Sequence, residues 1–239
     1  MADIVGTNHA DTLFANGLSK VYGRAGDDTV HGDGTGNYID GGRGADVLLA
    51  NGGASYVIGG ASNDHIDLGN DPNARDAQGY GGSGNDVIIG SWNCKLFGNS
   101  GADFLHVVAG SAEGGTGQDT ILSGLITGSN ASVHGGKGAD LFLADFWEGH
   151  TGLGRIEDFG VGKDEIQLRD RQFDDLGNVF EVPDAFGRLD VNDDGLLNVA
   201  DGLVRPDAIS GVDSLHLTIG LGTLVVHGVT QLATSDFIV

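Results

Sequence analysis

The chain has 239 residues, with 34 acidic side chains against 12 basic ones, and its formal net charge is −22. This charge argues against nucleic acid or an anionic membrane as a partner, because those surfaces are negative themselves. The sequence has no apolar stretch of the roughly 20 residues that a membrane span needs. Residues 1–15 lack a basic region followed by an apolar run, so we expect no cleaved signal peptide there.

The first predicted elements are repeats that run from residue 6 to residue 143. They follow the pattern Gly-Gly-x-Gly-x-Asp-x-apolar-x, with the clearest copies at Gly41, Gly81, Gly114 and Gly135 and looser copies at Gly6, Gly23, Gly59 and Gly98. The sixth-position aspartates recur every 16 to 22 residues, at Asp11, Asp28, Asp46, Asp64, Asp86, Asp103, Asp119 and Asp140. The eighth positions are all apolar, at Leu13, Val30, Leu48, Ile66, Ile88, Leu105, Ile121 and Phe142.

Each copy predicts a tight turn followed by a short strand. Glycine permits the left-handed conformations that expose backbone carbonyls, and the aspartate adds the hard carboxylate oxygen that Ca²⁺ prefers. After the turn, the apolar eighth residue points inward. The predicted calcium ligands are therefore the eight aspartates together with the fourth-position glycines Gly26, Gly44, Gly84, Gly101, Gly117 and Gly138.

The intervening half-turns carry no carboxylate at the equivalent position. Their sixth positions are Ser19, Asn37, Ser55, Ala77, Cys94, Gly110 and Ala131. We therefore predict an all-β fold, a parallel β-roll over residues 1–144 in which only one edge of turns binds calcium. With turns stacked about 4.8 Å apart, eight loops leave room for about seven ions between neighbours. Without ions the stacked carboxylates repel one another, so we expect this region to fold only with calcium.

An aromatic strip is predicted on the sheet whose strands follow the half-turns. Tyr22, Tyr38, Tyr56, Tyr80 and Phe97 fall at outward positions there. Such a strip can stack on sugar rings or dock a protein, although tyrosine also simply favours strands. On the opposite sheet, outward apolar residues between Val47 and Leu143 predict a surface that the C-terminal segment or a second chain covers.

The nonapeptide is similar to the repeats-in-toxin (RTX) repeat of hemolysin-type calcium-binding proteins. Residues beyond 144 resemble the C-terminal region of serralysin-type proteases and other type I secretion substrates, through residues 156–159, 162–168 and 236–239. The resemblance implies a bacterial protein exported by a type I system that reads an uncleaved C-terminal signal, and folded outside the cell. We accordingly divide the chain into the β-roll, 1–144, and a mainly-β capping and secretion region, 145–239. The His-Glu-x-x-His motif of serralysins is absent from the sequence, so we expect no protease activity.

A second calcium signature lies at residues 190–201 and looks like the EF-hand-type loop of dockerins. Its predicted ligands are Asp190, Asn192, Asp194, the carbonyl of Leu196, Asn198 and Asp201. The loop predicts one further ion, and the alternative is a solvated acidic turn. Dockerins carry two such copies, so a cohesin partner does not follow from one.

Of three functions weighed, we expect the first, with the second as its alternative, and we expect no enzyme. The first is a non-enzymatic, secreted calcium-binding protein of the cell surface or the matrix. The second is a polysaccharide-binding accessory module that uses the aromatic strip. The third is an enzyme whose active site lies among Asp145, Glu148, His150 and Glu157, which cluster in sequence. Cys94 is expected to be a small buried residue rather than a nucleophile.

Overall fold

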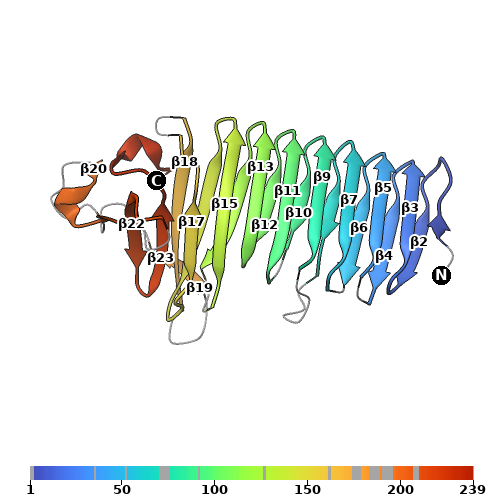
Figure 1. The fold of residues 1–239 in the computed structure, drawn as a ribbon, viewed down its shortest axis with the longest axis horizontal. Coiled ribbons are helices and arrows are strands. Elements are labelled where there is room, and N and C mark those ends of the chain that lie inside the picture. Colours follow the sequence, from blue (N-terminus) through green and yellow to red (C-terminus); the bar gives the residue numbers. More distant parts are fainter. Residues whose placement is uncertain are drawn as a thin grey trace.

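The computed structural model describes residues 3–34, 36–51, 53–69, 76–90, 92–125, 128–160, 163–173, 179–182, 189, 196–206 and 210–238. Within them the chain winds into two long sheets that face each other and stack turn upon turn along the molecule's longest axis (Figure 1). The N-terminal strands lie at one end of this axis and the C-terminal strands at the other (Figure 1). The predicted parallel β-roll is therefore present.

The first sheet contains every odd-numbered strand up to β17 and is then extended by three C-terminal strands. In spatial order it comprises β1 (Ile4–Val5), β3 (Lys20–Ala25), β5 (Tyr38–Arg43), β7 (Tyr56–Ala61), β9 (Gln78–Ser83), β11 (Cys94–Ser100), β13 (Gly110–Thr116), β15 (Asn130–Lys137), β17 (Leu153–Ile156), β23 (Gly222–Val226), β22 (Asp213–Ile219) and β21 (Val204–Pro206). We call it sheet A.

The second sheet contains the even-numbered strands from β2 to β18 together with β19, and we call it sheet B. It comprises β2 (Thr12–Asn16), β4 (Thr29–Asp33), β6 (Val47–Asn51), β8 (His65–Asp67), β10 (Val87–Ile89), β12 (Phe104–Val107), β14 (Thr120–Leu125), β16 (Leu141–Trp147), β18 (Glu165–Phe173) and β19 (Val179–Val182). A small third sheet pairs β20 (Leu196–Leu197) with β24 (Leu232–Ala233), and two short 3₁₀ helices, η1 (Val199–Asp201) and η2 (Thr234–Asp236), lie beside it in sequence.

The register of the roll follows from the alternation of side chains along each strand. The pairing of Val30 with Leu48 and of Leu48 with Ile66 aligns the inward residues of successive turns. From Val30 onward every predicted inward residue of sheet B is at most 2% exposed, whereas Leu13, in the first turn, is only partly buried. Parallel pairing continues through β16–β18 and β15–β17, and the C-terminal strands β22, β21 and β19 then join antiparallel.

Sheet B runs through residue 144 without a break, because β16 spans that position, and sheet A continues from β15 to β17. The division into two domains at this point stays a prediction. The described C-terminal strands extend the sheets at their ends. The outward apolar side chains of sheet B between Val47 and Leu143 are half-buried, except Val47 itself, which is 37% exposed. No helix among the described residues is long and apolar enough to cross a membrane.

Candidate calcium-binding edge

The aspartates of the repeat form one continuous ladder along one edge of the roll. The backbone N–H of each donates to the carboxylate Oδ1 of the aspartate in the next turn, at N···O distances of 2.7 to 3.1 Å. The carbonyl of each accepts a backbone N–H from the first residue of the neighbouring strand, as in Val47 to Asp28 at 2.8 Å. Backbone pairing and one carboxylate oxygen thus hold every turn in register with the next.

The second carboxylate oxygen, Oδ2, has no hydrogen-bond partner among the described residues in the seven inner members of the ladder. These are Asp28, Asp46, Asp64, Asp86, Asp103, Asp119 and Asp140, and each of these residues is at most 3% exposed. A buried anionic oxygen without a donor is strongly unfavourable. Seven of them in a row fit a stack of bound cations, and a carboxylate oxygen is the donor that Ca²⁺ prefers.

The electrostatics of the metal-free ladder agree with this arrangement. Burial raises the pKa of Asp46 and Asp119 to about 6 and that of Asp64 and Asp103 to about 7. The backbone hydrogen bond that each carboxylate accepts acts to lower its pKa, and the neighbouring aspartates act to raise it. Burial likewise raises the pKa of Asp28, Asp86 and Asp140. Near neutral pH the folded, metal-free edge therefore holds carboxylates that resist ionisation, and bound cations would relieve this.

The two ends of the ladder are closed by the protein itself. At the N-terminal end, Asp11 Oδ2 accepts hydrogen bonds from the N–H (2.6 Å) and the hydroxyl (2.8 Å) of Thr7, which lower the pKa of Asp11. At the other end, Asp164 Oδ2 accepts the N–H of Gly160 at 2.7 Å. The predicted end ligand Asp11 thus differs from the inner seven, because its second oxygen already has donors.

Asp164 is a ninth member of the ladder, and the prediction that the repeat ends after Asp140 is wrong. The Asp140 N–H donates to Asp164 Oδ1 at 3.1 Å, Asp164 is 4% exposed, and the inward residue Ile166 two positions later is fully buried. The repeat pattern did not reveal this turn, because Asp164 lies 24 residues after Asp140 and Phe159 stands where the first glycine of the repeat would be. The remaining pattern, Gly160, then Gly162 to Ile166, was the signal that could have found it.

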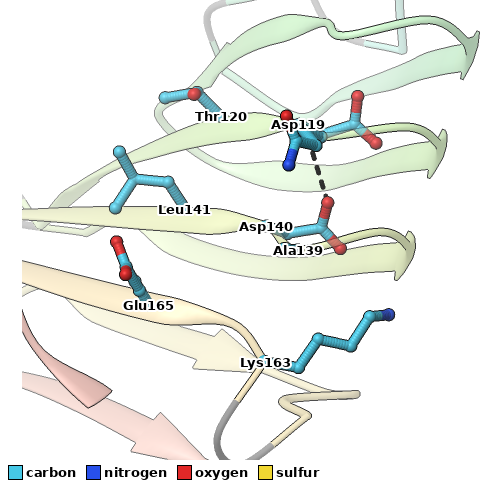
Figure 2. Close-up of a pocket in the computed structure, with 8 residues that line it drawn as sticks. Asp119, Thr120, Ala139, Asp140, Leu141, Lys163 and Glu165 are labelled. Carbon is cyan, nitrogen blue, oxygen red and sulfur yellow. Dashed lines mark hydrogen bonds between the residues drawn. The ribbon is translucent and has the colours of Figure 1, made fainter. Parts of the chain in front are cut away.

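The end of the ladder borders a pocket of about 280 Å³ between the last three turns. It is lined by Gln118, Asp119, Thr120, Ala139, Asp140, Leu141, Lys163 and Glu165. Figure 2 shows the hydrogen bond from Asp119 to Asp140 at this end and the Lys163 side chain on the following turn. Burial raises the pKa of Asp140, and the positive charge of the Lys163 ammonium on the following turn acts in the opposite direction.

The fourth-position glycines are required sterically at this edge. A Cβ at Gly44, Gly84, Gly101, Gly117 or Gly138 would overlap the carbonyl oxygen of the corresponding residue in the preceding turn. Gly101 also has a φ of +132°, a conformation that other residues rarely adopt. Their assignment as carbonyl ligands stays a prediction. No three carboxylate, imidazole or thiol groups in the described part of the chain converge on one point, so an ion here would need backbone oxygens as well.

The opposite edge is uncharged at the equivalent positions, as the sequence predicts. Ser19 donates its N–H to Asn37 Oδ1 at 3.2 Å, and Asn37 donates its own to Ser55 Oγ at 3.4 Å. Cys94 is buried, 1% exposed, with Sγ 3.7 Å from the carbonyl oxygen of Trp92. Short polar and apolar side chains therefore close this edge.

The aromatic strip exists as a ladder of rings on the outward face of sheet A. The pairs Tyr22–Tyr38, Tyr38–Tyr56, Tyr56–Tyr80 and Tyr80–Phe97 have centroid distances of 5.8, 5.7, 4.9 and 4.6 Å. Tyr56 is 36% exposed and the others are half-buried. The rings pack against one another, so much of the ring surface is already in contact.

The remaining predicted residues are only partly placed. Asp190, Asn192 and Asp194 of the dockerin-like loop lie outside the described residues. Leu196 lies on β20, while Asn198 Oδ1 accepts the Ala200 N–H (2.6 Å) and Asp201 Oδ2 accepts the Asn198 N–H (3.0 Å), so both side chains brace η1. Calcium binding by this loop stays a prediction.

The four residues of the predicted C-terminal active site do not form one site. Asp145, on β16 of sheet B, pairs with Arg169 at 2.6 Å and with Arg171 at 3.1 Å. Glu148 accepts the Phe173 N–H at 3.2 Å, and the His150 N–H donates to the Trp147 carbonyl at 3.0 Å. Glu157 instead follows β17 of sheet A and belongs to a different network.

A roll of Gly- and Asp-rich turns, with one edge of buried carboxylate oxygens that find no donor among the residues described, defines a calcium-binding repeat protein. Comparison with known families confirms this class, because the model of the RTX calcium-binding nonapeptide repeat matches residues 19–48, 40–73 and 79–92. These residues thus carry RTX calcium-binding nonapeptide repeats, as the sequence resemblance predicts.

Comparison with curated proteins gave no match. Among solved structures, the extracellular lipase LipA from Serratia marcescens aligns at 16% sequence identity with a TM-score of 0.28. The alignment covers all of this chain and 40% of the lipase chain, so the chain spans less than half of that protein's length. A similarity at this score supports no argument about activity.

Proposed function

We propose that this chain is a secreted calcium-binding protein that folds on meeting calcium after export, and that its calcium-binding roll acts without catalysis at the cell surface or in the matrix. The observation that carries the proposal is the row of seven buried Oδ2 atoms that have no donor in the described part of the chain. Aspartates about 5 Å apart repel by about 3 kcal/mol per neighbouring pair at an effective dielectric constant of 20. Calcium between the turns converts that repulsion into attraction, so folding and ion binding are one event.

The number of ions follows from the ladder. Eight hydrogen bonds link nine aspartates, which leaves eight intervals between turns. The sequence predicts about seven ions in the roll and one in the loop at 190–201; Asp164 adds one interval to the roll. Because Thr7 and Gly160 occupy the outer oxygens at the two ends, we expect the inner intervals to fill most tightly.

Calorimetry and circular dichroism during a calcium titration of metal-free protein test this proposal. We expect cooperative uptake of about seven to nine ions together with a gain of strand signal. Full strand signal in a chelator would contradict calcium-driven folding, and uptake of about twice as many ions would mean that the second edge also binds.

We propose that the chain is exported through an uncleaved C-terminal signal and folds outside the cell. The resemblance to type I secretion substrates supports this proposal, and the calcium requirement supplies a physical reason. In the low calcium of a cytosol the charged ladder stays unfolded, and an unfolded chain can pass an exporter. The test is export of the full chain, and of one that lacks residues 214–239, by cells with a type I system. Equal export of both would contradict the C-terminal signal.

The aromatic strip supports a second candidate, a polysaccharide-binding accessory module. Five rings in continuous contact along sheet A make an extended apolar strip between Lys20 and Lys95. Replacing Tyr56, the most exposed ring, by alanine should then reduce retardation in a polysaccharide affinity gel, whereas replacing the outward Ser111 should not. Unchanged migration of the calcium-loaded protein across neutral and acidic polysaccharides would contradict this candidate.

A further inference from the structure

A serine, a histidine and a glutamate from three separate segments meet at the C-terminal end of sheet A. Ser210 Oγ lies 2.9 Å from Nε2 of His227, and Nδ1 of His227 lies 3.8 Å from Oε2 of Glu157. Glu157 directly follows β17, His227 directly follows β23, and Ser210 precedes β22. A hydroxyl, an imidazole and a carboxylate in this order form the arrangement by which a base activates a nucleophile.

The carboxylate of this group is held in place by two further side chains. Arg155 Nε and Ser132 Oγ both donate to Glu157 Oε1, each at 3.0 Å, which leaves Oε2 directed at the imidazole. Burial acts to raise the pKa of Glu157, but these hydrogen bonds outweigh it and lower the pKa, so the carboxylate stays ionised. A fixed anion beside Nδ1 favours the tautomer that carries its proton there, and Nε2 is then free to accept the serine proton.

The imidazole and the serine are also positioned by backbone contacts. The His227 N–H donates to the carbonyl of Ile156 at 2.9 Å, which fixes the histidine against β17. The Val212 N–H donates to Ser210 Oγ at 3.2 Å, across Gly211 with a φ of +71°, and so holds the hydroxyl oxygen in place. Ser210 is exposed and therefore open to a substrate.

We propose that Ser210 is a nucleophile for acyl transfer, with His227 as its general base and Glu157 as a positioning residue, and that the site hydrolyses uncharged or cationic carboxylic esters. Ser210 Oγ attacks the carbonyl carbon and its proton passes to Nε2 of His227. Collapse of the adduct breaks the carbon–oxygen bond to the alcohol, which takes that proton. Water activated by the same imidazole then releases the acid and restores the serine. The chain's charge of −22 disfavours anionic esters.

The 3.8 Å between His227 Nδ1 and Glu157 Oε2 is longer than a hydrogen bond, and such catalytic contacts often tighten only when substrate is bound. The site depends on the roll, because Glu157 lies between β17 and the turn of Asp164, and Ser132 lies on β15. It goes beyond the proposed calcium function, and it should form only in the calcium-folded protein.

The test uses the full chain with calcium, its fold checked by circular dichroism, and two probes: a fluorophosphonate and p-nitrophenyl acetate. We expect the fluorophosphonate to label Ser210, as mapped by mass spectrometry of the wild-type chain. Labelling and ester turnover should be lost in Ser210→Ala, retained in the control Ser111→Ala on the outward face of β13, and reduced about 10²-fold in His227→Asn. Absence of label on Ser210 in protein with full strand signal would overturn the proposal, as would equal labelling of His227→Asn.

The positioning residue is tested by separating kcat from KM in the turnover of p-nitrophenyl acetate. Among the described residues the charged groups that contact His227 are Glu157 directly and Arg155 through it. Glu157→Gln removes the charge that orients the imidazole, so kcat should fall about tenfold while KM and the strand signal stay those of the wild type. An unchanged kcat in folded Glu157→Gln would mean that Glu157 does not position His227. Loss of strand signal with calcium in the wild type would instead contradict the proposed calcium function.

Discussion

Asp64 shows what one residue of the ladder contributes. Its Oδ1 holds the backbone of Asp46, while its buried Oδ2 has no donor within the described structure. Asparagine keeps the first acceptor but replaces the second with an N–H₂ group, which repels a cation. Asp64→Asn should therefore weaken calcium-driven folding by about 1–3 kcal/mol and raise the calcium midpoint in a dichroism titration.

The matched control for that substitution is Asp33→Asn. Asp33 is exposed at the end of β4, away from the ladder, and its backbone carbonyl rather than its carboxylate makes the inter-turn hydrogen bond to Gly17. Its calcium midpoint should stay that of the wild type. Equal effects of the two substitutions would mean that net charge, and not the ladder, governs calcium binding.

Gly101 carries a second prediction at this scale. Its φ is +132°, and a Cβ there would overlap the carbonyl of Gly84. Gly101→Ala should destabilise the calcium-loaded protein by more than about 2 kcal/mol, because strain and separation of two turns add together. Gly124, on β14, has no atom within 4 Å of an added Cβ, so Gly124→Ala should change stability by less than about 1 kcal/mol. Thermal unfolding at fixed calcium compares the two.

The ninth turn is the element that joins the ladder to the C-terminus. Asp164 begins it, and Ile166 on β18 pairs with Phe237 and accepts the N–H of Ile238 at 3.0 Å. The last residues of the described chain thus rest on a strand that the calcium edge positions. Phe237 is 7% exposed and Asp236 only 2%, so this segment is buried when the roll is folded.

Asp164→Asn should loosen that C-terminal segment. The amide nitrogen cannot accept the Gly160 N–H, so the turn before β18 loses a contact. We expect faster hydrogen exchange at Ile238 in the calcium-loaded variant, while strands β3 to β13 keep their protection. Glu165→Gln, at an exposed position of the same strand, should leave the exchange of Ile238 unchanged. Uniform loosening of the whole roll would contradict a local role for this turn.

Sequence periodicity predicts elements only as long as the spacing stays regular. A repeat of 16 to 22 residues predicts the inward residues from Val30 to Phe142 and the eight-member ladder, because every turn places the same residue types at the same positions. Asp164 escaped this reasoning at a separation of 24 residues. The contact of Glu157 with His227 follows from the parallel pairing of β17 with β23, and Ser210 precedes the antiparallel strand β22. No repeat spacing relates these three residues. The aromatic row was predicted, but that its rings stack on one another depends on side-chain rotation.

For the whole molecule, the ladder behaves as a set of coupled acids and makes the stability of the metal-free protein depend on pH. The pKa of Asp46 and Asp119 is raised to about 6 and that of Asp64 and Asp103 to about 7 in the fold, mainly by burial, whereas an unfolded aspartate titrates near 4. A raised pKa in the folded state means that protonation favours folding. The contribution is complete below about pH 4 and is lost as pH rises through 6 to 7.

Metal-free protein should therefore gain strand signal on acidification from pH 8 to pH 5, and calcium should replace protons as the folding ligand near neutrality. Because the same carboxylates bind either, calcium uptake should release protons, and the calcium midpoint should rise as pH falls through 7 to 6. Dichroism of chelator-treated protein across this range, paired with calcium titrations at pH 6 and pH 8, measures both effects. A calcium midpoint independent of pH would mean that the ladder is already ionised in the metal-free fold, and the burial of its Oδ2 atoms would then need another explanation.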